Sequence, residues 1–151
     1  MATNTYETVA KADYVLLKKA ERKLYLYHGD EILKTYRVAL GRQPDGHKRR
    51  NGDSRTPEGV YVLDWRNPNS KFFRSIHISY PNLSDRSDAS ERGDSPGGAI
   101  MIHGQPKSWV ERSQLLFHDN DWTEGCVAVQ DHEILEIWEI VEDGTTIEIL
   151  P

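Results

Sequence analysis

The chain has 151 residues, a length typical of one domain that can bury a sizeable core without disulfides or a metal. Hydrophobic residues make up 37% and charged residues 28%, which excludes an intrinsically disordered chain. The 19 basic and 24 acidic residues give a formal net charge of −5, which argues against a nucleic-acid partner. No apolar run approaches the roughly 20 residues of a membrane span, so none is expected.

The amino terminus is polar and lacks the apolar stretch of a signal peptide. We expect residues 1–11 to form a flexible segment ahead of one folded domain over residues 12–151. A cytoplasmic protein and a mature domain whose leader was removed both fit this amino terminus.

Apolar, β-branched and alternating runs predict strands through most of the chain. A glycine-aspartate pair, Gly29-Asp30, separates the second predicted strand from the third and predicts a hairpin there. Gly41 then ends the third strand. The predicted strands cover residues 13–19, 23–28, 31–40, 59–65, 75–80, 99–104, 126–129 and 146–150.

Two helices are predicted late in the chain, over residues 108–118 and 131–142. Asp131 is the expected N-cap of the second helix, and Gly144 is the expected residue just beyond its end. Residues 42–58 and 81–98 are predicted as loops; the second is either a functional lid or binding loop, or a disordered insertion. The pattern indicates a mostly-β (α+β) domain and not a βαβ repeat.

Cys126 is the only cysteine, which excludes an intrachain disulfide and a four-cysteine zinc site. A lone cysteine is commonly a small buried hydrophobic residue. Here Gly125 precedes it, and a glycine at that point allows a sharp turn whose backbone N–H groups can face a developing oxyanion. The context favours a nucleophile.

A thiol attacks as the thiolate, so it needs a neighbouring base. His103 ends a buried strand, which makes it the candidate base, although a histidine in that position can also belong to the core. The pair predicts a thiolate fraction near neutral pH well above that of a free cysteine. Strand alternation could bring His77 to the same cleft. A zinc site built from Cys126, His103 and His77 is conceivable, but no metal-ligand spacing supports it and no metal is expected.

The loop over residues 42–55 carries five basic residues against two acidic ones. It is a candidate contact for anionic glycan or for peptide carboxylates. An ordinary solvated loop explains the same charges.

Several motifs together resemble the L,D-transpeptidase (YkuD-type) catalytic domain family. Ile102-His103-Gly104 is followed, 23 positions after the histidine, by Cys126 within Thr123-Glu124-Gly125-Cys126-Val127. Thr56-Pro57-Glu58-Gly59 is similar to the family's Thr-Pro-x-Gly segment, and the hairpin that ends at Gly41 is similar to its opening strands. The likeness covers residues 12–150.

The resemblance implies a β-sandwich or partly open barrel and a cysteine enzyme that needs no cofactor. Its partner would be the stem peptide of peptidoglycan, attacked at the carbonyl between residues three and four to form a thioester. Cys126 would be the nucleophile and His103 the base, with Gly125, Thr123 and Gly104 as oxyanion or orienting residues. Candidate substrate contacts are His77, Glu124 and Arg55. Such a substrate implies a periplasmic or wall-facing location.

Two positions depart from the family pattern: Glu124 stands where histidine is frequent, and Ala128 where arginine or asparagine is usual. The stretch Asp-Trp-Thr-x-Gly-Cys-Val-Ala-Val resembles a subgroup that includes murein hydrolases or amidases. Three readings therefore stay open. They are acyl transfer to an amine, hydrolysis by a carboxypeptidase or by an amidase that releases murein-linked chains, and a non-catalytic wall-binding domain. Protein partners stay unassigned.

Overall fold

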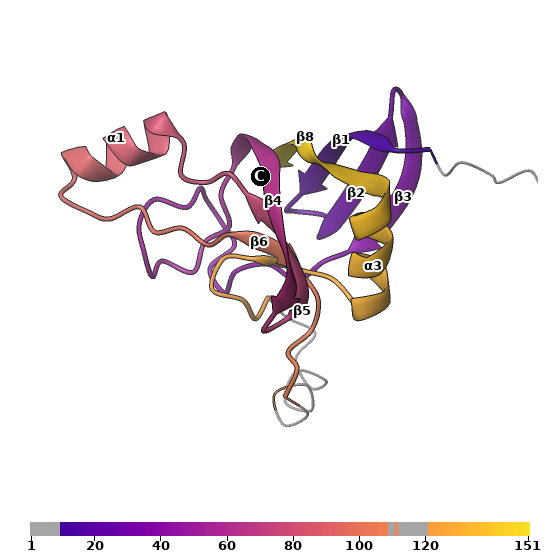
Figure 1. Ribbon diagram of the computed structural model, residues 1–151. Helices are drawn as coiled ribbons and strands as arrows, with labels where there is room; N and C mark the ends of the chain where they lie inside the picture. The colour runs from indigo at the N-terminus through magenta and orange to yellow at the C-terminus, as the bar shows by residue number, and fades with distance from the viewer. Residues whose placement is uncertain (1–9, 109–110, 112–120) are drawn as a thin grey trace, which may run out of the picture.

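The computed structural model describes residues 10–108, 111 and 121–151 (Figure 1). Residues 1–9 of the predicted flexible segment, and nearly all of the helix predicted over 108–118, lie outside these described residues. The strands are β1 (Ala12–Lys18), β2 (Lys23–His28), β3 (Glu31–Arg37), β4 (Gly59–Ser70), β5 (Phe73–Ile78), β6 (Met101–His103), β7 (Val127–Ala128) and β8 (Val141–Leu150). The described helices are α1 (Leu83–Glu91) and α3 (Asp131–Ile140).

The hairpin predicted around Gly29 is confirmed. β2 and β3 run antiparallel with His28 paired to Glu31, and Gly29 has φ +57°, a conformation that glycine adopts without steric cost. Alternate residues of β1 and β2 are buried, which is the pattern of strands with one face on a core.

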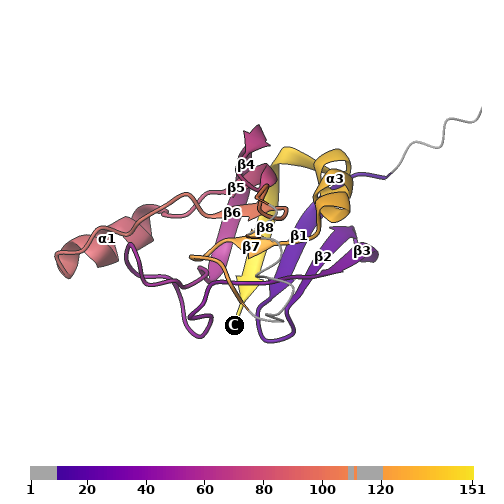
Figure 2. The same ribbon diagram turned by 90° about the horizontal axis from the view of Figure 1, so that it is seen from below.

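All strands of the described chain belong to one sheet of order β3-β2-β1-β8-β4-β5-β6-β7. β1 pairs with β8 and β6 with β7 in parallel, and the other neighbours are antiparallel. The sheet curls into a half-open barrel, as Figures 1 and 2 show from two directions. The expected mostly-β, partly open barrel is therefore confirmed, with β8 joining the amino-terminal hairpins to the strands β4 to β7.

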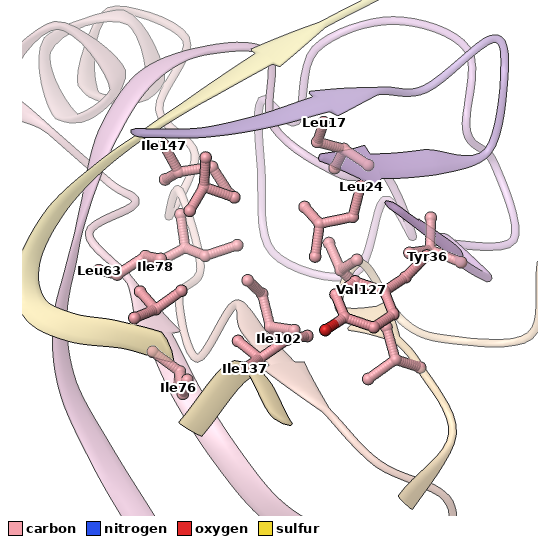
Figure 3. Packing of buried hydrophobic residues seen from close by; sticks show 14 of the residues in the cluster. Leu17, Leu24, Tyr36, Leu63, Ile76, Ile78, Ile102, Val127, Ile137 and Ile147 are labelled. Atoms are coloured by element: carbon pink, nitrogen blue, oxygen red, sulfur yellow. The ribbon is translucent and has the colours of Figure 1, made fainter. Parts of the chain in front are cut away.

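α3 closes the apolar side of the curled sheet. Ile134, Ile137 and Ile140 recur every three residues, so they share one helix face, and all three are buried. Figure 3 shows Ile137 next to Ile102 of β6, within the same core cluster. Each such side chain stabilises the fold by about 1.5–3 kcal/mol through burial.

The predicted ends of this helix were wrong. The N-cap is Gln130, whose N–H donates to Glu133 Oε1 at 2.9 Å, and not Asp131. The helix ends at Ile140, because Val141 already pairs with Ala12 of β1 and starts β8. Gly144 therefore lies inside a strand, with φ +98°, and not just beyond a helix.

Residues 81–98 are an ordered segment that contains α1, which corrects the expectation of a loop or a disordered insertion. The Asn82 side chain accepts from the Asp85 N–H at 2.9 Å, and the Asp85 carboxylate accepts from the Asn82 N–H at 3.0 Å. Asp85 also accepts from His47 Nε2 at 2.8 Å and from the Tyr61 hydroxyl at 2.7 Å. These bonds tie α1 to β4 and to the loop over residues 42–55, which we call the basic loop.

Figures 1 and 2 place α1 away from the sheet, at the end opposite α3. Leu83, at its start, is 86% exposed, so polar contacts hold this helix more than apolar burial does. Among the described residues, the helices are α1 and α3, and neither is long and apolar enough to cross a membrane.

Candidate active site

Cys126 lies directly before β7, at the edge of β6. Its Sγ accepts from the Met101 N–H at 3.4 Å and donates to the Ala99 carbonyl at 3.4 Å. Ala99 and Met101 border the start of β6, so the sulfur sits against the backbone of the neighbouring strand. The cysteine as a whole residue is half-buried.

Gly125 can only be glycine. It has φ +136°, and a Cβ built there would lie 2.7 Å from the Arg55 carbonyl oxygen. The Thr56 hydroxyl, which is fully buried, donates to the Gly125 carbonyl at 2.9 Å and accepts from the Gly41 N–H at 3.1 Å. One hydroxyl thus joins three segments: the one after β3, the Thr-Pro segment, and residues 123–126, which we call the cysteine loop.

The Thr123 side chain makes hydrogen bonds within the cysteine loop. Its buried hydroxyl donates to the Cys126 carbonyl at 2.7 Å and accepts from the Gly125 N–H at 3.1 Å. The contacts show that Thr123 holds the loop around the cysteine, and its expected orienting role stays a prediction. The Gly125 N–H, expected to face an oxyanion, is instead bonded to Thr123.

His103 ends β6 and is 1% exposed. Its Nδ1 lies 2.7 Å from the Gly104 carbonyl oxygen. A carbonyl oxygen only accepts, so Nδ1 carries the proton, and Nε2 of the neutral ring keeps a lone pair. A Cβ at Gly104 would lie 2.5 Å from Asp131 Oδ1, so the close packing at this position requires glycine.

Two aromatic side chains flank the imidazole. The Phe72 ring stacks on it with centroids 4.1 Å apart and planes at 15°, and the Trp122 centroid lies at 5.8 Å. This burial lowers the pKa of His103 to about 4, although the hydrogen bond to Gly104 acts in the opposite direction. The histidine is therefore neutral across the physiological range.

The register of the short strands relates the histidine to the cysteine. Ile102 pairs with Val127 and His103 pairs with Ala128, while the cysteine sulfur contacts Met101. Met101 and His103 alternate onto the same face of β6, roughly 6.6 Å apart along the strand. The fold thus brings the two predicted catalytic residues to one stretch of adjacent strands.

Burial raises the pKa of the Cys126 thiol, and the nearby Glu124 carboxylate raises it further. The Met101 N–H and the Lys48 ammonium lower the pKa but do not offset these effects. The expectation of an unusually high thiolate fraction is therefore wrong for the resting site, because both the thiol and the imidazole are desolvated and neutral.

The three candidate substrate contacts lie in different surroundings. His77 pairs with Met101 across β5 and β6, and the Met101 N–H contacts the sulfur, so His77 lies one strand away from the cysteine contact. Glu124 is exposed, beside the cysteine loop. Arg55 meets that loop through its carbonyl, while a Cβ at Gly46 would lie 3.3 Å from its guanidinium, which therefore extends along the basic loop.

The basic loop is less available to a ligand than its sequence suggests. Lys48 and Asp53 form an ion pair at 2.8 Å, with only 3% and 7% of their side chains exposed. Burial alone would raise the pKa of Asp53, but hydrogen bonds from the Arg49 N–H, Lys48 and two further backbone N–H groups hold it below its ordinary value. At least one of the five cations is thus neutralised within the loop.

Sequence reasoning did not assign a role to Asp121. Its carboxylate accepts two bonds from Arg22 Nε, at 3.1 and 3.2 Å, one from Nη2 at 2.9 Å, and one from the Leu40 N–H at 3.0 Å. These bonds hold the approach to the cysteine loop against Leu40, in the segment that follows β3. Its place at the start of the Asp-Trp-Thr-x-Gly-Cys stretch was the available signal.

No group of three or more histidine, cysteine, aspartate or glutamate side chains within residues 10–108, 111 and 121–151 is arranged to hold a metal ion. The chemistry offered here is that of a thiol, a neutral imidazole and backbone N–H groups.

Comparison with known proteins agrees with this geometry. The sequence model of the L,D-transpeptidase catalytic domain, YkuD, matches residues 12–149. YafK of Escherichia coli strain K12, which is named as a candidate L,D-transpeptidase, is 32% identical over 135 residues; the match covers 85% of this chain and 46% of YafK. The chain therefore spans about half the length of the curated relatives it matches.

Solved structures share the fold. The helical cell shape determining protein Pgp2 from Campylobacter jejuni is 26% identical with a TM-score of 0.67, over 93% of this chain and 48% of Pgp2. An L,D-transpeptidase from Mycobacterium smegmatis, at 12% identity, shows the fold alone, with a TM-score of 0.59 over 93% of this chain and 59% of that protein. From the match over residues 12–149, the chain belongs to the L,D-transpeptidase (YkuD) catalytic domain family.

Proposed function

We propose that the protein is a cysteine acyltransferase acting on peptidoglycan stem peptides, with Cys126 as nucleophile and His103 as general base. The observation that carries this proposal is the neutral His103 ring beside the cysteine strand. Its Nδ1 is bound to the Gly104 carbonyl, so Nε2 is left to accept a proton.

The first step couples bond formation to proton transfer, because the resting thiol is protonated. As Sγ attacks the stem-peptide carbonyl, its proton passes to His103 Nε2, and the carbonyl electron pair moves onto oxygen. The Cys126 N–H is the candidate donor to that oxygen, since the Gly125 N–H already donates to Thr123. The intermediate then collapses to a thioester, and His103 returns the proton to the departing amine.

The second step repeats this sequence with a new nucleophile. His103 takes a proton from an incoming amine, the amine attacks the thioester, and the thiol regains a proton as it leaves. Burial lowers the pKa of His103 to about 4, which keeps its ring unprotonated and able to accept in both steps.

Water attack on the same thioester is the second candidate, and one feature favours it. Ala128 is 3% exposed and exchanges two backbone hydrogen bonds with Ala39, at 3.0 and 2.9 Å. A methyl group there offers no polar contact to position an acceptor amine. Hydrolysis would produce a tripeptide or release a chain tethered to murein. Either reaction implies a periplasmic or wall-facing location.

The direct test is to incubate the protein with purified disaccharide-tetrapeptides and measure its intact mass. We expect an adduct equal to the acyl fragment on the wild type and none on Cys126→Ala. Absence of an adduct and of any product, together with retention on sacculi, would instead support a non-catalytic wall-binding domain. Among products, cross-linked or exchanged muropeptides indicate transfer, and tripeptides indicate water attack.

A further inference from the structure

β4 contains an irregularity close to the candidate active site. Leu63 pairs with Ile78 of β5 and Arg66 pairs with Ile76, so β4 has one more residue than β5 in this interval. Asp64 and Trp65 together oppose the single residue His77. Such β-bulges redirect side chains and occur frequently next to active sites.

The bulge gathers three side chains into one cluster. Asp64 Oδ1 accepts from His77 Nδ1 at 2.6 Å, and the Trp65 ring stacks on the imidazole with centroids 4.5 Å apart and planes at 12°. His77 is largely covered, with 15% of its side chain exposed, whereas Asp64 is 38% and Trp65 48% exposed. A polar, well-held histidine thus lies behind an indole with one open face and a carboxylate with a second oxygen.

This cluster is aligned with the cysteine across the sheet. His77 pairs with Met101 of β6, and the Met101 N–H contacts the Cys126 sulfur. Met101 lies on β6 and the bulge lies on β4, so two strand spacings separate the bulge from the strand that the sulfur contacts. At about 4.8 Å a spacing, the cluster lies roughly 10–14 Å from the reacting atom.

That separation matches the reach of a stem peptide. Three extended residues span about 10 Å, so the sugar that carries the peptide lies roughly 10–14 Å from the carbonyl of residue three. We propose that Asp64, Trp65 and His77 form a saccharide subsite for the glycan to which the stem peptide is attached. This inference rests on the proposed function and adds a glycan requirement to it.

The chemistry of the cluster suits a sugar ring. The open indole face can stack on the C–H groups of a pyranose, and a large flat aromatic surface gains much from such burial. The free Asp64 oxygen and His77 Nε2, the latter with a lone pair when Nδ1 is the donor, can accept from hydroxyl or amide groups. The Asp64–His77 bond fixes both acceptors before the ligand arrives, which reduces the ordering cost.

The test compares two substrates that share one stem peptide, a free tetrapeptide and the same peptide on its disaccharide. For the wild type we expect kcat/KM to be about five- to tenfold higher with the disaccharide. Trp65→Ala should bring this ratio close to one, and Asp64→Asn should lower it by about twofold. Val60→Ala, which changes an exposed apolar residue of the same strand, should keep the wild-type ratio.

A binding measurement separates this inference from the proposed function. The disaccharide without peptide is titrated into Cys126→Ala, and into the double variant that also carries Trp65→Ala, with folding checked by circular dichroism. Saturable binding that the second substitution abolishes would support the subsite even if no turnover were found. Equal substrate ratios in wild type and Trp65→Ala, or disaccharide binding that survives loss of Trp65, would overturn it.

Discussion

β1, β2 and β3, at one end of the sheet, have six or seven residues each, whereas β6 and β7 at the other end have three and two. The first end is held mainly by alternating apolar side chains that face the core. At the second end, the buried hydroxyl of Thr56 and the carboxylate of Asp121 bind backbone groups far away in sequence. The contrast teaches that overall stability and the geometry of the candidate site depend on largely separate contacts.

The largest effect expected at the short-strand end is on catalysis. Cys126→Ala should lower turnover of disaccharide-tetrapeptide by about three orders of magnitude or more, because removal of the nucleophile disables the whole catalytic unit. Its midpoint of urea denaturation should change little, since a thiol is a weak hydrogen-bond donor and acceptor and makes only two such contacts, at 3.4 Å. Near-normal turnover, measured by chromatography of muropeptides, would reject the proposed mechanism.

In the core, the main effect of a substitution should be on stability. Ile137→Ala should lower the free energy of unfolding by about 2–5 kcal/mol, because it leaves a cavity between α3 and β6. Leu135→Ala is the matched control on the same helix, because Leu135 is 39% exposed. Similar losses for both variants in urea denaturation would contradict the assigned core.

The ionisation of His103 should make both stability and activity depend on pH. The pKa of His103 is lowered from 6.5 to about 4 in the folded chain, so folding favours the neutral ring. The resulting stabilisation is complete above pH 6.5 and is lost as the pH falls from 6.5 to about 4, by about 3 kcal/mol. Urea denaturation at several pH values measures it.

The control for this pH effect is His103→Gln, which should lack that part of the pH dependence. In the wild type, the acidic limb of kcat/KM should lie near pH 4 and not near 6.5. An acidic limb near 6.5 would show that the ring is far more hydrated than its burial between Phe72 and Trp122 implies.

Thr56 should contribute less to stability than the core isoleucine does. Thr56→Val keeps the shape but leaves the Gly41 N–H and the Gly125 carbonyl without their partner, at a cost of about 1–3 kcal/mol. Turnover should fall by up to about 100-fold, because the cysteine loop loses its support. Thr35→Val, at an exposed position of β3, should leave both quantities within error. A loss of stability without a loss of turnover would break the proposed link.

The success of the sequence predictions follows the range of the interactions involved. The hairpin at Gly29 was predictable because turn and alternation are local signals. α1 was not, because Leu83 is nearly fully exposed and the helix is held through Asp85 by His47 and Tyr61. The end of α3 was misplaced because pairing of Val141 with β1 overrides a helix-terminating glycine three residues later.

The same distinction applies to the site. Cys126 and His103 were recognisable as a candidate pair from their glycine neighbours and spacing. The flanking rings of Phe72 and Trp122, and the carboxylate of Asp121, come together only through the tertiary fold. Burial of the thiol also raises its pKa, which reverses the expected ionisation and which no local motif could indicate.

The Thr56 hydroxyl has a consequence for the order of assembly during folding. It bonds to Gly125, 69 positions further along the chain, and to Gly41 in an earlier segment. Contacts between such distant residues form late, because long stretches of chain must first be brought together. A chain still leaving the ribosome therefore carries its lone thiol without the contact that supports the loop around it, and the proposed acylation would require the completed domain.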